Sequence, residues 1–182
     1  MIICITGQMA AGKNYISSLY ERNGWFCLDA DEQVHNAIKT ATPEILKAFE
    51  KQAAAENISL QNPDGTLNRR NLGRLIFPRP ELLKKQESII YPIIIEETKK
   101  IIKENCGKNI ILNATVLYKT PELLKMCDKI IFVKARFFVR LKRAIKRDKM
   151  PLRQILSRFW TQRNLFSKYK NTGIPIETVD NN

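Results

Sequence analysis

The chain is poor in the residues that build disulfide frameworks and zinc sites. Its 182 residues include one histidine and four cysteines, and the cysteines have no close pair spacing (Cys4, Cys27, Cys106 and Cys127). Three of the four lie in or beside apolar runs, where a buried thiol packs as a small hydrophobic group. We therefore expect neither a zinc site nor a disulfide framework.

Long hydrophobic runs are also missing. The longest apolar run, at 89–95, is far shorter than the roughly 18 to 20 residues that span a bilayer. The first residues, MIICITG, form an apolar strand pattern without the basic segment or cleavage site of a secretory signal. Internal repeats and low-complexity segments are absent as well. These absences, with the length of the chain, predict a cytoplasmic protein that folds as a single unit.

Acidic residues are scarce relative to basic ones. The 18 Asp and Glu residues face 31 Lys and Arg residues, which gives a net charge of +13. Such a charge attracts polyanions, including nucleotides, phosphorylated cofactors, nucleic acid and anionic lipid, and does not choose among them. The hydrophobic share of 44% and charged share of 27% are those of an ordinary globular protein, which argues against disorder.

Short apolar runs rich in isoleucine and valine alternate with helical patterns. We expect strands at 2–6, 25–29, 109–113, 129–135 and 176–180. We expect helices in the gaps between them, including 13–22, 31–39, 43–54, 68–76, 80–104 and 121–127. Continuous apolar strands separated by helices are typical of a parallel sheet covered on both faces, which predicts the α/β class.

Two regions interrupt this alternation. About 80 residues separate the second and third expected strands, too many for one crossover helix, which predicts a helical insertion suited to substrate recognition. The basic stretch 136–170 is expected to form a helical pair divided near Met150 and Pro151. Arg140, Arg143 and Arg147 recur there at helical spacing, a pattern equally typical of a solvated helix face.

The segment GQMAAGK provides Gly7, four further residues, Gly12 and Lys13 between an expected strand and an expected helix. This is the context of a Walker A phosphate-binding loop, in which backbone N–H groups surround phosphate and the lysine reaches the β and γ phosphates. Asn14 stands where serine or threonine normally binds Mg²⁺. Its amide oxygen is also a hard ligand, or else Asn14 only begins the helix and Mg²⁺ is held by phosphates, waters and a distant carboxylate.

Two aspartates follow the second expected strand in CLDADEQVH. Asp29 and Asp31 are therefore expected at the carboxyl edge of the sheet, where open α/β folds bind ligands. A magnesium-assisted kinase needs one carboxylate near the metal and another to orient or deprotonate the attacking hydroxyl. Aspartates at this position also serve as helix caps, and the spacing alone does not decide between the two roles.

The order of motifs along nearly the whole chain resembles the dephospho-CoA kinase family of P-loop kinases. The matching blocks are ITGQMAAGK, LDADEQVH, DGTLNRRNLGRLIF, ESIIYPIII, IILNATVLYKT, LKRAIKRD, SRFWTQ and TVDNN. The resemblance implies transfer of the ATP γ-phosphate to the ribose 3′-hydroxyl of dephospho-CoA, the last step of coenzyme A biosynthesis. It also implies a three-layer P-loop NTPase-like fold with a five-stranded parallel sheet.

The resemblance divides the single domain 1–182 into three parts: a core over 1–30, 105–135 and 171–182, a helical CoA-binding insertion over about 31–104, and a lid over about 136–170. It implies a catalytic role for Lys13, Asp31 and Arg143, with Asp31 as the base or hydroxyl-orienting residue. The residues implied in ATP binding are Gly7, Gln8, Met9, Ala10, Ala11, Gly12, Lys13, Asn14, Tyr15, Arg147 and Asn181. Those implied in acceptor binding are Asp31, His35, Arg69 and Tyr91, and those near Mg²⁺ are Asn14 and Asp29.

Several positions depart from the family pattern near the expected chemistry. Asn14 replaces Ser or Thr, His35 an Arg, Tyr91 a His, and Asn113, Thr115 and Lys119 an Asp, a Pro and a Glu. His35, the only histidine, is expected to face the substrate cleft rather than to act as a base. Arg158 and Gln162 match the family motif on the helix after the lid arginines.

These departures keep other functions open. One is a relative that binds ATP or CoA without efficient transfer, and another is a nucleoside or nucleotide kinase with a different acceptor. RNA binding by the basic stretch is a third, although its aromatic residues, Phe159, Trp160 and Phe166, are expected to pack into the core or lid instead. We expect small-molecule partners, no nucleic acid, no membrane, and a monomer or weak homo-oligomer.

Overall fold

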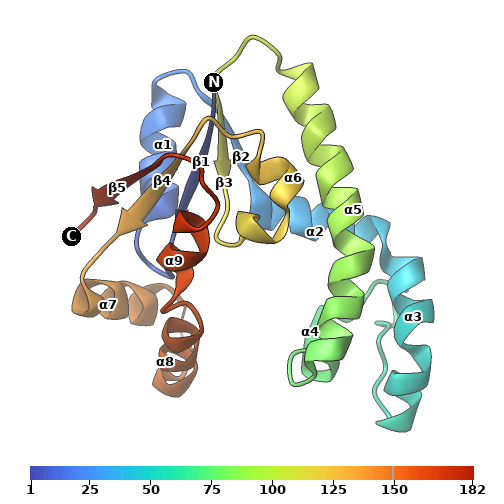
Figure 1. Cartoon of the computed structure of the whole chain (residues 1–182). Helices are drawn as coiled ribbons and strands as arrows, with labels where there is room; N and C mark the ends of the chain where they lie inside the picture. Colours follow the sequence, from blue (N-terminus) through green and yellow to red (C-terminus); the bar gives the residue numbers. More distant parts are fainter. Residues whose placement is uncertain (149) are drawn as a thin grey trace. The chain divides into compact units, whose positions relative to one another are not determined.

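The computed structural model describes residues 1–148 and 150–182. The strands are β1 (Ile2–Gly7), β2 (Phe26–Asp29), β3 (Ile110–Asn113), β4 (Lys129–Lys134) and β5 (Ile176–Asp180) (Figure 1). The helices are α1 (Lys13–Arg22), α2 (Ala30–Thr40), α3 (Thr42–Ala55), α4 (Arg69–Ile76), α5 (Pro80–Glu104), α6 (Pro121–Leu124), α7 (Phe137–Asp148), α8 (Leu152–Thr161) and α9 (Leu165–Lys170). A 3₁₀ turn, η1 (Leu117–Lys119), precedes α6. The expected strands are confirmed, as are the expected helices, although α6 ends earlier than predicted.

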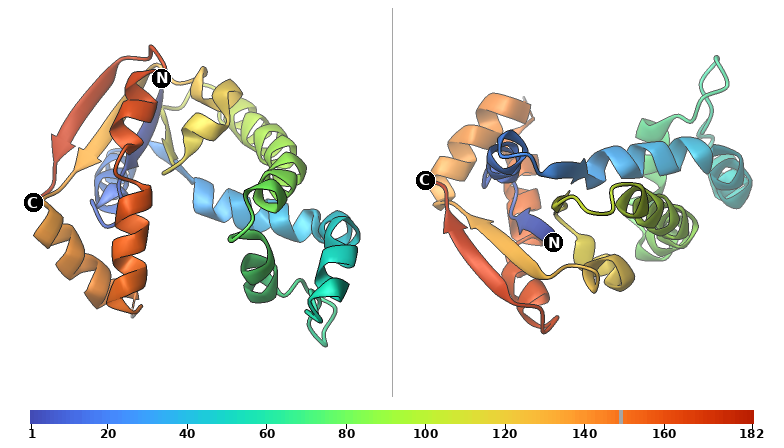
Figure 2. Two further views of the ribbon diagram at one scale, coloured as in Figure 1. Left: turned by 60° about the horizontal axis from the view of Figure 1, so that its bottom comes forward. Right: turned by 90° about the horizontal axis from the view of Figure 1, so that it is seen from above.

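All strands pair in parallel, in the order β2-β3-β1-β4-β5, which confirms the five-stranded parallel sheet and the α/β class. Successive side chains of a strand point to opposite faces. Ile3 and Ile5 of β1 pack with Ile16 of α1, whereas Phe132 of β4 meets Tyr169 of α9 at a ring separation of 6.4 Å. Figure 2 shows α1 and α9 on the two faces of the sheet. The sheet and its two helical covers form three layers.

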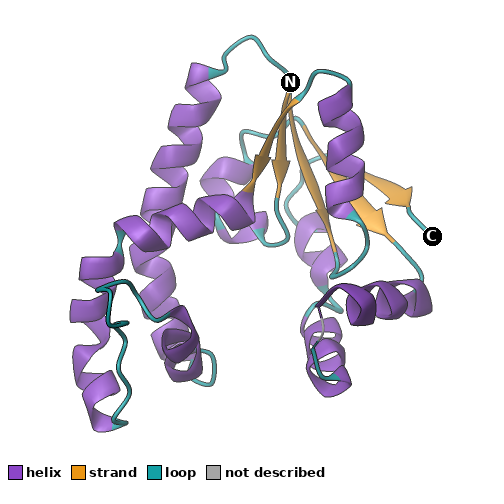
Figure 3. Ribbon diagram, turned by 180° about the vertical axis from the view of Figure 1, so that it is seen from behind, coloured by secondary structure: helices purple, strands orange, loops and turns teal. Residues whose placement is uncertain are grey.

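The chain divides into two compact units, which we describe separately. The sheet unit comprises residues 1–30 and 101–182, and the helical unit comprises residues 31–100. The helical unit buries Ile45, Phe49 and Leu75 completely, and apart from one isolated bridge its described residues form helices and loops (Figure 3). Across the described part of the chain, none of the helices combines the length and the apolar character needed to cross a membrane.

The basic stretch 136–170 forms three helices rather than the predicted pair. The division near Pro151 is confirmed, because Pro151 caps α8 at its N-terminus; Lys149, in the same stretch, lies outside the described residues. A second break separates α8 from α9. At this break the backbone carbonyl and side chain of Gln162 bond to residues that follow β1, so the chain leaves the helical path after Thr161.

The aromatic residues of this stretch are only partly as predicted. Phe159 is buried, and Phe166 packs edge-on against Phe132 at 5.0 Å, as expected. The prediction is wrong for Trp160, which is 69% exposed and has the Arg163 guanidinium 4.0 Å above its ring. Successive residues of a helix point about 100° apart, so the face that buries Phe159 turns Trp160 outward.

Candidate active site

The loop after β1 has two glycines that the surrounding atoms require. A Cβ at Gly7 would lie 2.4 Å from the carbonyl oxygen of Val133 in β4. Gly12 has a φ of 98°, in the left-handed region, and a Cβ there would lie 1.9 Å from Nδ2 of Asn181. Only glycine permits both the backbone conformation and these close approaches. The loop therefore runs tightly from the carboxyl end of β1 into α1.

A cavity of about 520 Å³ lies over this loop and the start of α1. Its lining residues are mostly cationic or small: Ala10, Gly12, Lys13, Asn14, Arg143, Lys146 and Arg147. The first N–H groups of a helix lack intrahelical partners and carry the positive end of its dipole. Four cationic side chains and a helix N-terminus therefore face one cavity, an arrangement suited to a polyphosphate.

The residue after β5 links the loop to α7. The backbone N–H of Asn181 donates to the Lys134 carbonyl at 2.8 Å, and its side-chain amide donates to the Ala11 carbonyl at 3.0 Å. Arg143 in turn donates through Nη1 to the carbonyl of Asn181 at 2.7 Å. The structure thus brings together three parts of the predicted nucleotide site that are far apart in the sequence.

Other residues assigned to ATP lie differently. Arg147 lines the cavity, and its guanidinium also makes a bidentate pair with Asp148, with distances of 2.5 and 3.0 Å. The hydrogen bond from Arg147 holds the pKa of the Asp148 carboxyl below its usual value. Tyr15 is exposed in the first turn of α1 and is not among the residues lining the cavity. Gln8 and Met9 are not lining residues either, and instead contact α7 and the segment after α8.

Three polar side chains meet where β1, β2 and β3 end. Asp29 and Asn113 are register partners in neighbouring strands. Nδ2 of Asn113 lies 3.0 Å from Oδ1 of Asn14 and 3.4 Å from Oδ2 of Asp29. Oδ1 of Asn113 is buried and has no hydrogen-bond partner among the described residues. The two departures from the family pattern at 14 and 113 are therefore in direct contact.

This cluster fits Mg²⁺ only together with a bound nucleotide. Within the described residues, no group of three His, Cys, Asp or Glu side chains could hold a metal ion alone. Asp29 and the amide oxygens of Asn14 and Asn113 are hard oxygen donors of the kind that Mg²⁺ accepts beside phosphates and waters. The orphaned Oδ1 of Asn113 is consistent with such a ligand set.

In the helical unit, Nη1 of Arg69 contacts Nδ1 of His35. Because arginine has no acceptor atom, the histidine nitrogen accepts, and the remaining proton of the neutral ring lies on Nε2. Both residues line a cavity of about 490 Å³, with Ile38, Lys39, Thr42, Gly65, Thr66 and Leu67. His35 thus faces a hollow of its own unit, and its place in the substrate cleft stays a prediction.

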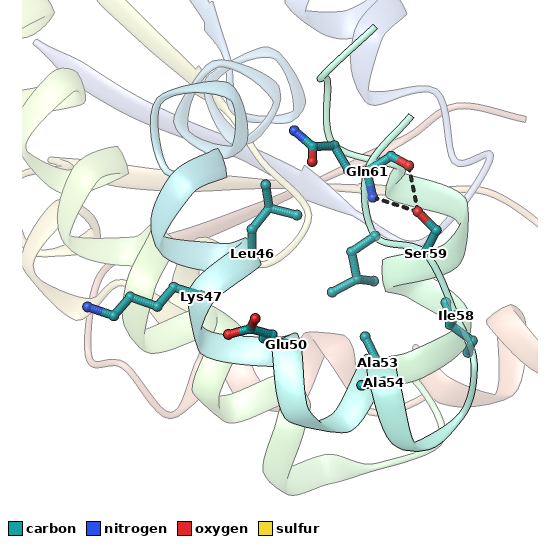
Figure 4. A pocket seen from close by; sticks show the side chains of 9 residues that line it. Leu46, Lys47, Glu50, Ala53, Ala54, Ile58, Ser59 and Gln61 are labelled. Carbon is teal, nitrogen blue, oxygen red and sulfur yellow. Dashed lines mark hydrogen bonds between the residues drawn. The ribbon is translucent and has the colours of Figure 1, made fainter. Parts of the chain in front are cut away.

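The other residues assigned to the acceptor do not line this cavity. Asp31 is exposed in the first turn of α2, and Tyr91 is half-buried on α5. A further hollow of about 430 Å³ lies between α3 and the chain that follows it (Figure 4). Hydrogen bonds between Ser59 and Gln61 shape its rim, and it contains none of the predicted site residues.

The family model described as dephospho-CoA kinase matches residues 1–181. The chain belongs to the dephospho-CoA kinase family. It is 37% identical to the dephospho-CoA kinase of Treponema denticola over 93% of this chain and 77% of the relative. It is 31% identical to that of Treponema pallidum over 99% of this chain and 86% of the relative.

Solved structures with the same fold include a protein from Thermus thermophilus, TT1252, and a dephospho-CoA kinase from Campylobacter jejuni. The first has a TM-score of 0.83 at 23% identity, and the match covers 100% of this chain and 88% of the Thermus chain. The second has a TM-score of 0.69 at 22% identity, and the match covers 100% of this chain and 89% of the Campylobacter chain. These similarities support the P-loop kinase fold. Neither they nor the relatives of the dephospho-CoA kinase family support a different acceptor or a role restricted to binding.

In this member of the dephospho-CoA kinase family, the sequence alone left the environment of Arg140 undecided. Its spacing was also compatible with a solvated face, but Arg140 is only 6% exposed and bonds to Gln8 and Met9 of the loop. No spacing in the sequence distinguishes it from Arg143, because both lie on the same basic helix. The distinction arises only when α7 packs beside the loop.

Proposed function

We propose that this chain transfers the γ-phosphate of ATP to the ribose 3′-hydroxyl of dephospho-CoA, giving coenzyme A and ADP as the last step of coenzyme A biosynthesis. Membership of the dephospho-CoA kinase family over residues 1–181 is the observation that carries this proposal. The 3′-oxygen forms a new bond to the γ-phosphorus while the bond from that phosphorus to the oxygen bridging to the β-phosphate breaks. The hydroxyl proton passes to a base, and ADP carries the released electron pair.

On the nucleotide side, the phosphates of ATP are assigned to the cavity over the loop. Lys13 and the N–H groups at the start of α1 bind the β and γ phosphates. Arg143, held by its bond to the Asn181 carbonyl, places a guanidinium at the same cavity, where it neutralises charge on the transferring group. Catalysis of phosphoryl transfer is mainly positioning and charge neutralisation, which this cationic cavity supports.

Mg²⁺ is the expected companion of ATP, and the oxygens of Asp29 and Asn14 would hold it together with phosphates and waters. Mg²⁺ bound there would supply positive charge that neutralises the phosphates. Asn113 orients both side chains through its Nδ2. This chain therefore uses an amide pair where the family pattern has a hydroxyl and a carboxylate.

On the acceptor side, we assign binding to the helical unit and water exclusion to a lid formed by α7 to α9. Asp31 is the base or hydroxyl-orienting residue, and Tyr91 adds a contact to the acceptor. Arg69 and Lys39 are the cations beside the second cavity, suited to the diphosphate of dephospho-CoA. Nε2–H of His35, left as a donor by the contact of Nδ1 with Arg69, provides a directed hydrogen bond.

The proposal is tested by mixing the purified protein with ATP, Mg²⁺ and dephospho-CoA and detecting coenzyme A by mass. Coenzyme A should form with the wild-type chain and fall by about 10²-fold or more with Lys13→Ala, which also controls for contaminating kinase. A parallel panel of nucleosides and nucleotides replaces the acceptor. Phosphorylation of a panel member in place of dephospho-CoA, or binding of both substrates without product, would overturn the proposal.

A further inference from the structure

The phosphate-binding loop holds a backbone conformation that a residue with a Cβ adopts rarely. Ala10 has a φ of 60°, in the left-handed region. Such conformations persist where surrounding contacts fix them, and they concentrate at functional sites. Met9 and Ala10 pack into an apolar cluster with Ala144, Ile155 and Phe159 of α7 and α8. The loop is therefore shaped from outside, by the two helices beside it.

Polar contacts fix the same part of the loop from two sides. From α7, Arg140 donates through Nε to the Met9 carbonyl at 2.9 Å and through Nη1 to Oε1 of Gln8 at 2.7 Å. After α8, Oε1 of Gln162 accepts the Met9 N–H at 2.6 Å, and its carbonyl accepts from Nε2 of Gln8 at 3.0 Å. Both backbone polar groups of Met9 are thus bound by side chains. We call Arg140 and Gln162 the loop brace.

The described surroundings of Arg140 are apolar or neutral, so its charge does not serve an ion pair. The side chain is buried, its guanidinium lies 4.3 Å above the Phe159 ring, and no carboxylate pairs with it in the described part of the chain. Its Nη2 is buried without a hydrogen-bond partner among those residues, and burial lowers the pKa of the group. Burying a cation beside neutral acceptors alone is costly. The hydrogen bonds that its side chain does make all go to the loop.

We propose that Arg140 and Gln162 are positioning residues that hold the phosphate-binding loop in its binding shape, so that ATP affinity depends on α7 and α8. This inference rests on the proposed role of the loop in ATP binding. Arg140 does not line the cavity over the loop, in contrast to Arg143, so it acts through the loop and not by touching the nucleotide. Because the Met9 N–H is donated to Gln162, phosphate binding falls to N–H groups later in the loop and at the start of α1.

The first test measures the Kd for ATP by calorimetry without any acceptor, so its outcome does not depend on catalysis. Arg140→Gln should weaken ATP binding by about 10- to 100-fold, the effect of losing hydrogen bonds from a charged donor that fixes the site. The Kd for dephospho-CoA should not change. Arg153→Gln is the matched control: it removes the same charge from an exposed position in the first turn of α8, and should weaken ATP binding less than about fivefold. Unchanged ATP affinity in Arg140→Gln, or an equal loss of affinity in Arg153→Gln, would overturn the proposed role of the loop brace.

A second test asks whether the two residues act on the same element. Gln162→Met removes the acceptor of the Met9 N–H and should also weaken ATP binding. Because both residues act on Met9, the double variant should lose less affinity than the product of the two single losses. Arg140→Lys, which keeps the charge and reaches one acceptor, should recover part of the affinity. The inference is contradicted if the loss of ATP affinity in the double variant equals the product of the two single losses. It is also contradicted if Arg140→Lys binds ATP no better than Arg140→Gln.

Two complications have separate readouts. Thermal unfolding without ligand shows whether a variant is folded; if Arg140→Gln is not, Gln162→Met alone decides the question by its ATP affinity. If the wild-type chain binds ATP but makes no coenzyme A, the proposed function fails. The brace then still stands or falls by the ATP affinities of the variants.

Discussion

The loop of the sheet unit and the residues of the helical unit that we propose to bind the acceptor are built in opposite ways. In the loop, backbone groups of Met9 and Ala11 are bound by side chains from three distant parts of the chain, and the surrounding residues are buried. In the helical unit, Arg69 and Asp31 are exposed, and His35 is half-buried. The backbone of the loop is therefore fixed by folding, whereas the residues proposed to bind the acceptor are exposed or half-buried polar side chains.

This difference has an energetic meaning. A site whose donors are fixed before the ligand arrives loses little conformational entropy on binding, whereas exposed long side chains lose rotamer freedom when they engage. Variants in the two regions should therefore fail differently. Changes in the loop alter ATP affinity through its shape, and changes in the helical unit alter acceptor binding one contact at a time.

The largest effect is expected for Asp31→Asn, which keeps the size of the side chain and removes its basicity. Turnover should fall by about 10²- to 10⁴-fold, the usual contribution of a general base, with ATP affinity unchanged. Steady-state kinetics of coenzyme A formation measure it. Glu32→Gln, at the next exposed position of the same turn, is the control and should keep wild-type turnover. Turnover unaffected by Asp31→Asn would remove Asp31 from the mechanism.

A smaller effect, confined to the acceptor, is expected for Arg69→Met. Loss of the guanidinium that contacts His35, and that we propose to bind phosphate, should raise the KM for dephospho-CoA by about 10-fold. The Kd for ATP should stay as it is, because the loop does not depend on this residue. Arg70→Met is the control, because it removes a neighbouring exposed charge that does not line the cavity of His35 and Arg69. Equal effects of the two variants would reduce the role of Arg69 to general attraction of anions.

The smallest effect concerns the amide pair formed by Asn14 and Asn113. Asn14→Ser removes the nearer of the two acceptors of Nδ2 of Asn113, and Asn113→Asp sets a carboxylate beside Asp29, so each single variant should be less stable than wild type. Together the two changes restore a hydroxyl that donates to a carboxylate. A double-mutant cycle by urea unfolding should give a favourable coupling of at least about 0.5 kcal/mol. Purely additive losses would show that the two positions are independent.

Local sequence patterns were sufficient for the sheet and the loop, but not for contacts made between distant elements. Apolar runs predicted the strands, and the spacing of Gly7, Gly12 and Lys13 predicted the loop, because these features depend on neighbours in the chain. The bond between Asn14 and Asn113 joins residues 99 positions apart. It exists because β3 lies beside β1 in the sheet order, which no local pattern specifies.

Arg140 and Trp160 illustrate the same limit in opposite directions. A helical spacing of arginines left exposure and burial equally open, and Arg140 is buried because the loop offers it two oxygen acceptors and Phe159 a ring face. An aromatic residue in an amphipathic helix suggested burial, yet Trp160 is exposed because α8 buries its Ile155 and Phe159 face. In both cases the partner, and not the residue type, decides the environment.

The hydrogen bond from Asn181 to the Ala11 carbonyl joins residues 170 positions apart, which affects when the loop is fixed during synthesis of the chain. During translation, the loop after β1 is made long before β5, but it acquires this contact only after β5 has been synthesised and has joined the sheet beside β4. Contacts between residues so distant in sequence form late, because a long loop must close first. A nascent chain that stops before Asn181 would lack this contact, so we expect it to hold the loop, and any nucleotide bound there, less tightly than a chain in which β5 has joined the sheet.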